Sequence, residues 1–313
     1  MTRFGLQLPN FTLGVPDTDL FERVVELATT GEESGFSSVW VMDHFYQLPA
    51  LGGADQPMLE GYTLLGALAA RTSRVELGTL VTGVTYRNPA LLAKIVTTLD
   101  IISSGRAILG LGAAWHDIEH EALGFDFPPV KERMDRLEEA VQICRAMFTE
   151  DAPSFDGRYY QIREARNLPR PIRPGGPRIM IGGGGEKRTL KLVAQYADLC
   201  NVSGDADMIR HKLDVLRGHC AAVGRDPSEI TTTRLGTLML TDSAEQTAQT
   251  QAFLTEMAGA EFAAACTVGT DDEVVEQVTA LLDAGLDELI FNLPTADPAG
   301  IRRAGGLLTS RFG

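Results

Sequence analysis

Short apolar runs alternate with longer segments of helical periodicity along most of this chain. The clearest run, residues 38–42, is apolar after its first serine, which is typical of a parallel strand buried on both faces. The segment before it, 17–33, spaces its apolar residues three and four apart, as a helix that covers a sheet does. A chain that repeats strand and helix in this order belongs to the α/β class, as an open sheet or a closed barrel.

Eight strands are predicted, over residues 3–10, 38–44, 75–82, 107–113, 178–181, 199–202, 230–240 and 288–293. The predicted helices lie over residues 17–33, 62–70, 89–102, 115–124, 130–148, 186–196, 206–223, 244–258 and 271–284, and at the C-terminus. Eight strands with their helices indicate one (β/α)8 TIM barrel formed by residues 1–313. Residues 151–177 break the alternation and contain a predicted hairpin over 154–162. They are too few for a core of their own, so we expect insertions on the C-terminal rim and no second domain.

The chain carries a formal net charge of -14, which argues against nucleic acid and anionic membrane surfaces as partners. Its apolar runs are shorter than the roughly 20 residues that span a bilayer, and the first strand leaves no room for a signal peptide. The four cysteines have no paired spacing, so they indicate free thiols in a reducing compartment. We therefore expect a cytoplasmic protein that acts on a small organic molecule.

In a barrel of this kind the chemistry lies at the C-terminal ends of the strands. Asp43 and His44 end the predicted strand 38–44, where adjacent side chains point to opposite faces if the strand continues. We expect His44 to face a ligand, because an imidazole can donate, accept or carry a proton near neutral pH. Asp43 would then support His44 or contact the edge of a ring. The alternative is that the pair only caps the following loop.

The strongest local indication of a ligand site is the glycine run that ends the predicted strand 178–181. Glycine lets the backbone approach a ligand closely, and a helix beginning at Glu186 would present free N–H groups to a phosphate. Lys187 and Arg188 add local cations to an acidic chain. The alternative is a turn that binds nothing. The predicted phosphate-binding residues are Gly182, Gly183, Gly184 and Gly185.

Gly112, Trp115 and His116 follow the predicted strand 107–113. Glycine there would let a flat ligand lie against the backbone, and Trp115 could form a wall beside it. Packing under the next helix is the alternative for Trp115, and His116 could be a second polar contact. His120 lies four residues after His116, the spacing of a helical metal pair, but no further ligands support a metal site and none is expected.

Together these rim segments resemble the luciferase-like monooxygenase superfamily, in the branch that uses coenzyme F420, an 8-hydroxy-5-deazaflavin. The resemblance covers nearly the whole chain and rests on Trp40-x-x-Asp43-His44-Phe45, Leu77-Gly78-Thr79, Arg87-Asn88-Pro89, Gly110-x-Gly112-x-x-Trp115, Asn167-Leu168-Pro169-x-Pro171, Ile181-Gly182-Gly183, Ala197-Asp198 and Val268-Gly269-Thr270. The Asp-His-Phe ending resembles the F420-dependent dehydrogenases and reductases more than the FMN-dependent members.

The resemblance implies an F420-dependent oxidoreductase that transfers a hydride between C5 of the deazaflavin and an unidentified small substrate. It implies a non-prolyl cis peptide bond at Leu80–Val81 behind the ring, and a homodimer. His44 would be the catalytic acid or base. The residues implied to bind the cofactor are Asp43, Leu80, Val81, Thr82, Gly83, Gly112, Trp115 and the four glycines 182–185.

Two residues depart from the F420-dependent glucose-6-phosphate dehydrogenases of that branch. Those enzymes have an acidic residue at the position of Trp115 and a lysine at that of Asp205, so a sugar-phosphate substrate is not expected. An FMN-dependent monooxygenase and a catalytically silent flavin or deazaflavin carrier are the alternatives on the same barrel. Hydrolase chemistry is not indicated, because the chain has no G-x-S-x-G segment.

Overall fold

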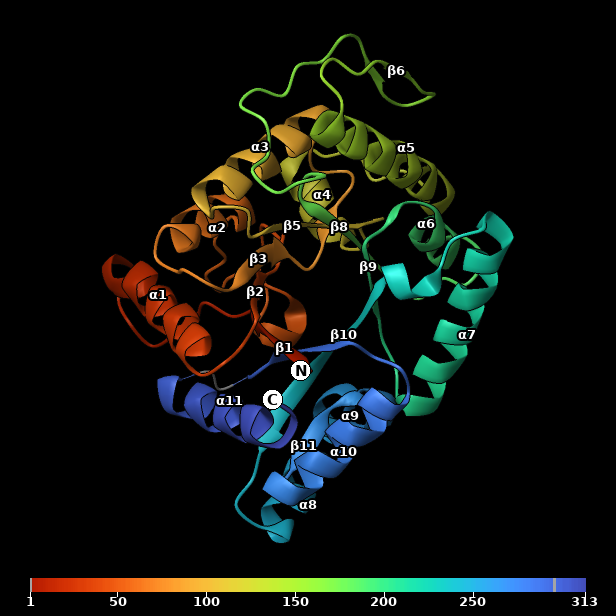
Figure 1. Cartoon of the computed structure of the whole chain (residues 1–313). Helices are drawn as coiled ribbons and strands as arrows, with labels where there is room; N and C mark the ends of the chain where they lie inside the picture. Colours follow the sequence, from red (N-terminus) through yellow and green to blue (C-terminus); the bar gives the residue numbers. More distant parts are fainter. Residues whose placement is uncertain (1, 295–296) are drawn as a thin grey trace.

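Eight parallel strands close into a barrel that helices surround (Figure 1). The computed structural model describes residues 2–294 and 297–313. β9 pairs with β10, and β12 pairs with β1, so the ring of strands is complete. The predicted (β/α)8 barrel is confirmed. In order around the ring, the strands are β1 (Arg3–Leu8), β2 (Ser38–Val41), β3 (Glu76–Thr79), β5 (Ala107–Gly112), β8 (Arg178–Gly182), β9 (Leu199–Val202), β10 (Thr231–Leu240) and β12 (Glu288–Asn292).

Helices follow the strands at the positions that the apolar spacing predicts, and most bounds agree within two residues. The helices are α1 (Asp17–Glu33), α2 (Gly61–Ala69), α3 (Pro89–Ile102), α4 (Asp117–Leu123), α5 (Val130–Thr149), α6 (Thr189–Tyr196), α7 (Ala206–Val223), α8 (Ala244–Ala258), α9 (Ala260–Ala265), α10 (Asp271–Asp283) and α11 (Pro298–Phe312). The short elements α9 and β11 (Thr267–Gly269) were not predicted, because neither is long enough to show a periodicity. None of these helices is both long and apolar enough to cross a membrane, within the residues described.

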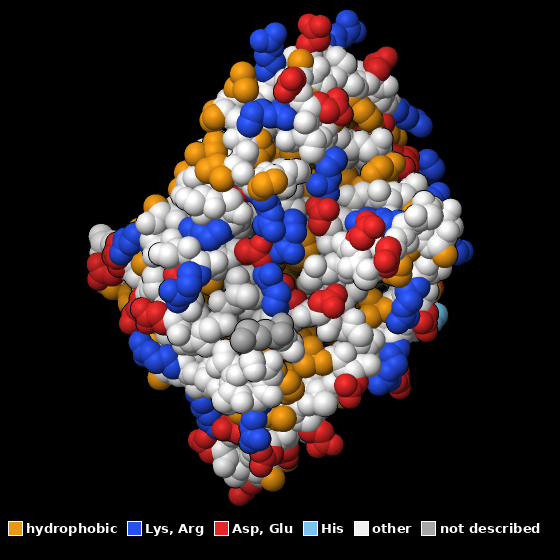
Figure 2. Space-filling model, in the orientation of Figure 1, with side chains coloured by type: hydrophobic (Ala, Val, Ile, Leu, Met, Phe, Trp, Pro, Cys, Tyr) orange, Lys and Arg blue, Asp and Glu red, His pale blue; other side chains and the backbone are white. Residues whose placement is uncertain are grey.

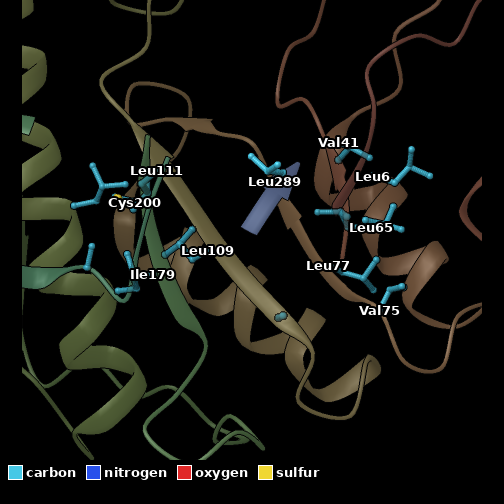
Figure 3. Close-up of a cluster of buried hydrophobic side chains, with 14 of the residues drawn as sticks. Leu6, Val41, Leu65, Val75, Leu77, Leu109, Leu111, Ile179, Cys200 and Leu289 are labelled. Atoms are coloured by element: carbon cyan, nitrogen blue, oxygen red, sulfur yellow. The ribbon is translucent and has the colours of Figure 1, made fainter. Parts of the chain in front are cut away.

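The strands are buried on both faces, which explains their continuous apolar runs. Side chains that point outward pack against the helices, as Leu77 does beside Leu65 of α2 (Figure 3). Side chains that point inward fill the barrel around Trp40 and Ile108. Alternate residues of one strand therefore belong to two separate cores.

The two ends of the chain meet on the face seen in Figure 1, where the N and C labels lie close together. Phe4 of β1 and Phe312 of α11 bring their ring centroids to 5.9 Å. At the N-terminal ends of the strands, Glu76 lies among Arg3, Arg173 and Arg178. Figure 2 shows acidic and basic side chains interspersed over the viewed face. Because the chemistry of such barrels lies at the opposite end, these ion pairs contribute to stability.

The segment 151–177 lies along the outer flank of the barrel. Its hairpin, β6 (Phe155–Asp156) and β7 (Gln161–Ile162), agrees with the prediction. The segment is held by α3 and α5, where Asp100 accepts from the backbone of 172–173 and Glu139 from that of 158–160. The insertion that covers the C-terminal rim is instead α4.

Strand register brings the ends of β2 and β3 together. Leu8 of β1 lies beside Val41, and Val41 lies beside Thr79 of β3. The segments that follow these residues, 42–45 and 80–83, therefore emerge next to each other at the C-terminal rim.

Candidate active site

The residues predicted for the site meet in one cavity of about 370 Å³ at the C-terminal ends of the strands. Its wall also includes residues that were not predicted, namely Tyr86, Ala113, Ala114, Thr189, Asn201 of β9 and Leu235 of β10. The predicted catalytic residue and all predicted cofactor-binding residues line this cavity, whereas His116 does not. The predicted residues that line it are Asp43, His44, Leu80, Val81, Thr82, Gly83, Gly112, Trp115, Gly182, Gly183, Gly184 and Gly185. Segments as far apart in the sequence as Asp43 and Leu235 thus share one concave site, as expected for a barrel mouth.

His44 is held by a carboxylate that was not predicted. Its Nδ1 lies 2.7 Å from Oε1 of Glu119, which is fully buried on the rim helix α4. The other carboxylate oxygen accepts from the backbone N–H groups of Phe45 and Tyr46, at 2.7 and 3.3 Å. Glu119 therefore fixes both the His44 ring and the chain that leaves it. A sequence signal existed, since an acid on the helix after the fourth barrel strand lies at the rim, but 75 residues separate the pair.

Tyr86 adds a further hydrogen bond to Oε1 of Glu119 through its hydroxyl. Burial and the neighbouring carboxylate raise the pKa of Tyr86, so the phenol stays protonated and donates. Burial alone would raise the pKa of Glu119, but the hydrogen bonds from His44, Tyr86 and Phe45 lower it to about 2. Glu119 is therefore an anion at neutral pH.

Asp43 points away from His44 and binds a different partner. Its two oxygens accept from Nη1 and Nη2 of Arg87, at 2.6 and 3.0 Å. Arg87 also pairs with Glu60 at the start of α2. The interpretation that Asp43 supports His44 is therefore wrong, because Glu119 holds that place. Asp43 still borders the cavity, but its carboxylate is committed to an ion pair.

The floor of the cavity is formed where β3 ends and β4 (Thr82–Gly83) begins. The Leu80–Val81 peptide bond is cis, as the resemblance implied. Gly112 lies directly against this segment, since a Cβ there would come within 2.8 Å of Cγ2 of Val81. The Thr82 hydroxyl is turned away and bonds the Tyr62 hydroxyl at 2.7 Å. A flat ligand could thus lie on an apolar surface with little side-chain obstruction.

The glycine run forms a turn before α6, which begins at Thr189 and not at Glu186. Gly183 has a φ of +122°, a conformation that glycine adopts readily. Within the described residues, the N–H groups of Gly184 and Gly185 and the Thr189 hydroxyl have no protein partner. All three residues line the cavity, and free donors of this kind suit a phosphate group.

The cations beside this turn differ from those expected. Arg188 is directed outward, where it donates to Asp135 of α5 at 2.6 Å, and Lys187 is exposed. A lysine of α7, Lys212, instead reaches the turn and pairs with Glu186 at 2.6 Å. The binding capacity of the turn therefore lies in its backbone and in Thr189.

Trp115 stands at the opening, 62 % exposed, with its ring 5.6 Å from that of His44. His116 is buried behind it and does not border the cavity. His120 is buried as well, with Nε2 at 2.7 Å from Thr85 Oγ1 and Nδ1 at 2.6 Å from the His116 carbonyl. Both nitrogens of His120 are thus engaged in structural hydrogen bonds. No group of three potential metal ligands is found in the part of the chain that the structure describes.

The arrangement combines an apolar floor, free N–H donors at one end and one histidine at the other. An elongated ligand with a flat ring and an anionic group fits these features, because the ring meets Leu80 and Val81 and the anion meets the turn 184–189. His44 has Nδ1 bound by Glu119, so Nε2 is the nitrogen left for a ligand. Proton transfer to or from a bound molecule is the chemistry that this geometry can perform.

Comparisons with known proteins agree with this picture. The family model of the luciferase-like monooxygenases matches residues 2–262. An F420-dependent glucose-6-phosphate dehydrogenase from Amycolatopsis mediterranei (strain U-32) is 32% identical over 306 residues, covering 88% of this chain and 89% of that protein.

Solved structures share the fold. An F420-dependent secondary alcohol dehydrogenase, in complex with an F420–acetone adduct, has a TM-score of 0.80 at 20% identity and covers 99% of this chain and 98% of its own. The oxygenating constituent of a 3,6-diketocamphane monooxygenase from Pseudomonas putida, in complex with FMN, has a TM-score of 0.77 at 19% identity, with 99% and 97% covered. One barrel thus carries both kinds of cofactor, and the fold does not distinguish them.

Proposed function

This chain belongs to the luciferase-like monooxygenase family, and on that premise we propose that it is an F420-dependent oxidoreductase acting on a small organic substrate. The observation that carries the proposal is the 32% identity with an F420-dependent dehydrogenase over 88% of the chain. The cavity supports it, because the residues present fit a deazaflavin with its phosphate. Leu80, Val81 and Gly112 would support the ring, and the turn 184–189 would bind the phosphate.

In the proposed reaction the substrate is an alcohol, or the carbonyl compound that its oxidation yields. Bound F420 supplies the acceptor or donor of a hydride. His44 takes the proton from the substrate hydroxyl through Nε2 as the carbonyl forms, and returns it in the reverse direction. Trp115, whose ring lies 5.6 Å from that of His44, would border the substrate at the opening.

Glucose 6-phosphate is not the proposed substrate, although the relatives carry that name. Asp205, where those enzymes are expected to have a lysine, caps α7 by accepting from the Met208 N–H at 2.9 Å. Trp115 stands where those enzymes are expected to have an acidic residue. The two departures remove a cation and an acid from the substrate side, which favours an uncharged and more apolar alcohol.

One titration tests the proposal. The purified apo-protein is mixed with F420 and, separately, with FMN, and cofactor fluorescence is followed. Micromolar binding of F420 without binding of FMN is expected, followed by reduction of F420 on addition of an alcohol from a panel that includes glucose 6-phosphate. Binding of FMN in place of F420 would overturn the proposal.

The proposed working form is a cytoplasmic homodimer. Leu91 and Ile102 of α3 and the nearby Leu168 are 55, 44 and 60 % exposed, which supports a partner on this flank. Light scattering on the purified protein tests it, and a monomeric mass would contradict it.

A further inference from the structure

We infer that Glu119 is the positioning residue that fixes His44 in one tautomer, with the proton on Nδ1 and the lone pair of Nε2 left for the substrate. The inference rests on the proposed function for its catalytic meaning. It goes beyond that function because it assigns a role to a residue that does not border the cavity. Its starting point is the set of donors around one buried carboxylate.

The carboxylate of Glu119 is surrounded by hydrogen-bond donors. Its Oε2 accepts from the N–H groups of Phe45 and Tyr46, and its Oε1 from the Tyr86 hydroxyl and His44 Nδ1. An ionised carboxylate can only accept. A neutral His44 must therefore donate from Nδ1, and its Nε2 then carries the free lone pair.

The rim helix α4 gives Glu119 little freedom to move. The next residue, His120, is anchored by the Thr85 hydroxyl at 2.7 Å, and its ring stacks on Tyr86 with centroids 4.7 Å apart. The N–H of Phe125 closes the end of α4 on the His120 carbonyl at 2.8 Å. These contacts therefore fix the position of Glu119, and Glu119 in turn fixes the position of the His44 ring.

The same donors determine what a glutamine would do at this position. In Glu119→Gln, the two backbone N–H groups need the one remaining carbonyl oxygen. The amide NH2 then lies where Oε1 was, and it donates to His44 Nδ1. This forces the proton onto Nε2, which can no longer accept one from the substrate.

The test measures the tautomer and the turnover separately. The protein is labelled with 15N in its histidines, and the His44 signals are identified by their loss in His44→Asn. The wild type is expected to show the Nδ1–H form and Glu119→Gln the Nε2–H form. In F420 turnover, Glu119→Gln is expected to lower kcat by about 10²–10⁴-fold, with an unchanged Kd for F420.

Thr85→Val is the matched control, because it releases the His120 anchor of α4 and leaves the bonds of Glu119 intact. It is expected to keep the Nδ1–H form of His44. If Thr85→Val changes the tautomer and kcat as Glu119→Gln does, the effect belongs to α4 packing and the inference fails. A wild-type His44 in the Nε2–H form overturns it without any variant.

The two proposals fail in different ways. If the protein neither binds nor reduces F420, the proposed function fails, and the tautomers of the wild type and of Glu119→Gln still decide whether Glu119 positions His44. If F420 is turned over but Glu119→Gln keeps the wild-type kcat, the proposed function stands and the inference is overturned.

Discussion

Arg87 donates through both terminal nitrogens to the buried carboxylate of Asp43, at 2.6 and 3.0 Å. Asp43 immediately precedes His44 and borders the cavity. Burial raises the pKa of Asp43, and the guanidinium opposes that shift. The pair thus holds the end of the second barrel strand by charge, while Glu119 holds the next residue, His44.

Arg87→Met should destabilise the fold by about 3–5 kcal/mol, because it leaves a carboxylate buried without a partner. Urea denaturation followed by circular dichroism measures the change. Adding Asp43→Asn to the variant should restore part of the loss, since the unpaired charge is then removed.

Arg71→Met is the control for this prediction. Arg71 also binds a carboxylate through two nitrogens, both at 2.9 Å, but its partner Glu22 is on the surface. Little change is expected there. Equal losses in the two variants would show that burial of Asp43 does not determine the effect.

His44→Ala should keep most of the affinity for F420 and slow hydride transfer by about 10²–10⁴-fold. The ring borders only one end of the cavity, whereas the floor and the glycine turn contribute most of the residues that line it. Stopped-flow reduction of F420 measures the chemical step, and fluorescence titration measures the affinity. Turnover at the wild-type rate would remove His44 from the proposed mechanism.

The barrel was predictable because its strands are buried on both faces and its helices on one. Strand ends were less predictable. β2 ends at Val41, whereas the prediction extended the strand to residue 44, because the polar residues follow the apolar run without a break in the sequence. One predicted strand, 75–82, is two short strands separated by Leu80 and Val81. The local sequence shows the composition of a strand. It does not show a break such as the one at Leu80 and Val81, which depends on contacts with the neighbouring β5.

The cavity-lining residues were predictable because the rim is set by where strands end. The residues that hydrogen-bond to them or pair with them were not predictable. Glu119 is one of several acids on the rim segment 117–121, and nothing local indicates which one turns inward. Arg188 follows the glycine run at a position that suits a phosphate ligand, but its guanidinium donates to Asp135 of α5 instead. Pairings between distant segments follow from packing, which a single sequence does not show.

Thr189→Val should weaken F420 binding by about 10–100-fold, because it removes a hydrogen bond to a charged phosphate. Thr189 begins α6, and its hydroxyl borders the cavity beside Gly185. The deazaflavin riboside that lacks the phosphate should bind equally to both proteins, which provides an internal control. Equal losses of affinity for F420 and for the riboside would show that the substitution affects binding of the deazaflavin ring. That result would contradict a phosphate site at this turn.

Glu119 should make the stability of the protein sensitive to acid. Its pKa is lowered from 4.5 to about 2 in the folded state, so the unfolded chain binds its proton first as the pH falls. The stabilisation is complete above the unfolded value and is lost progressively from about pH 4.5 towards pH 2. At about 1.4 kcal/mol per pH unit, the free energy of unfolding should fall by about 1 kcal/mol more in the wild type than in Glu119→Gln between pH 5 and 3.5. Other carboxylates titrate alike in both proteins, so the difference between two urea titrations isolates this group. Parallel pH dependences would mean that Glu119 is not held as a buried anion, and the tautomer assigned to His44 would lose its physical basis.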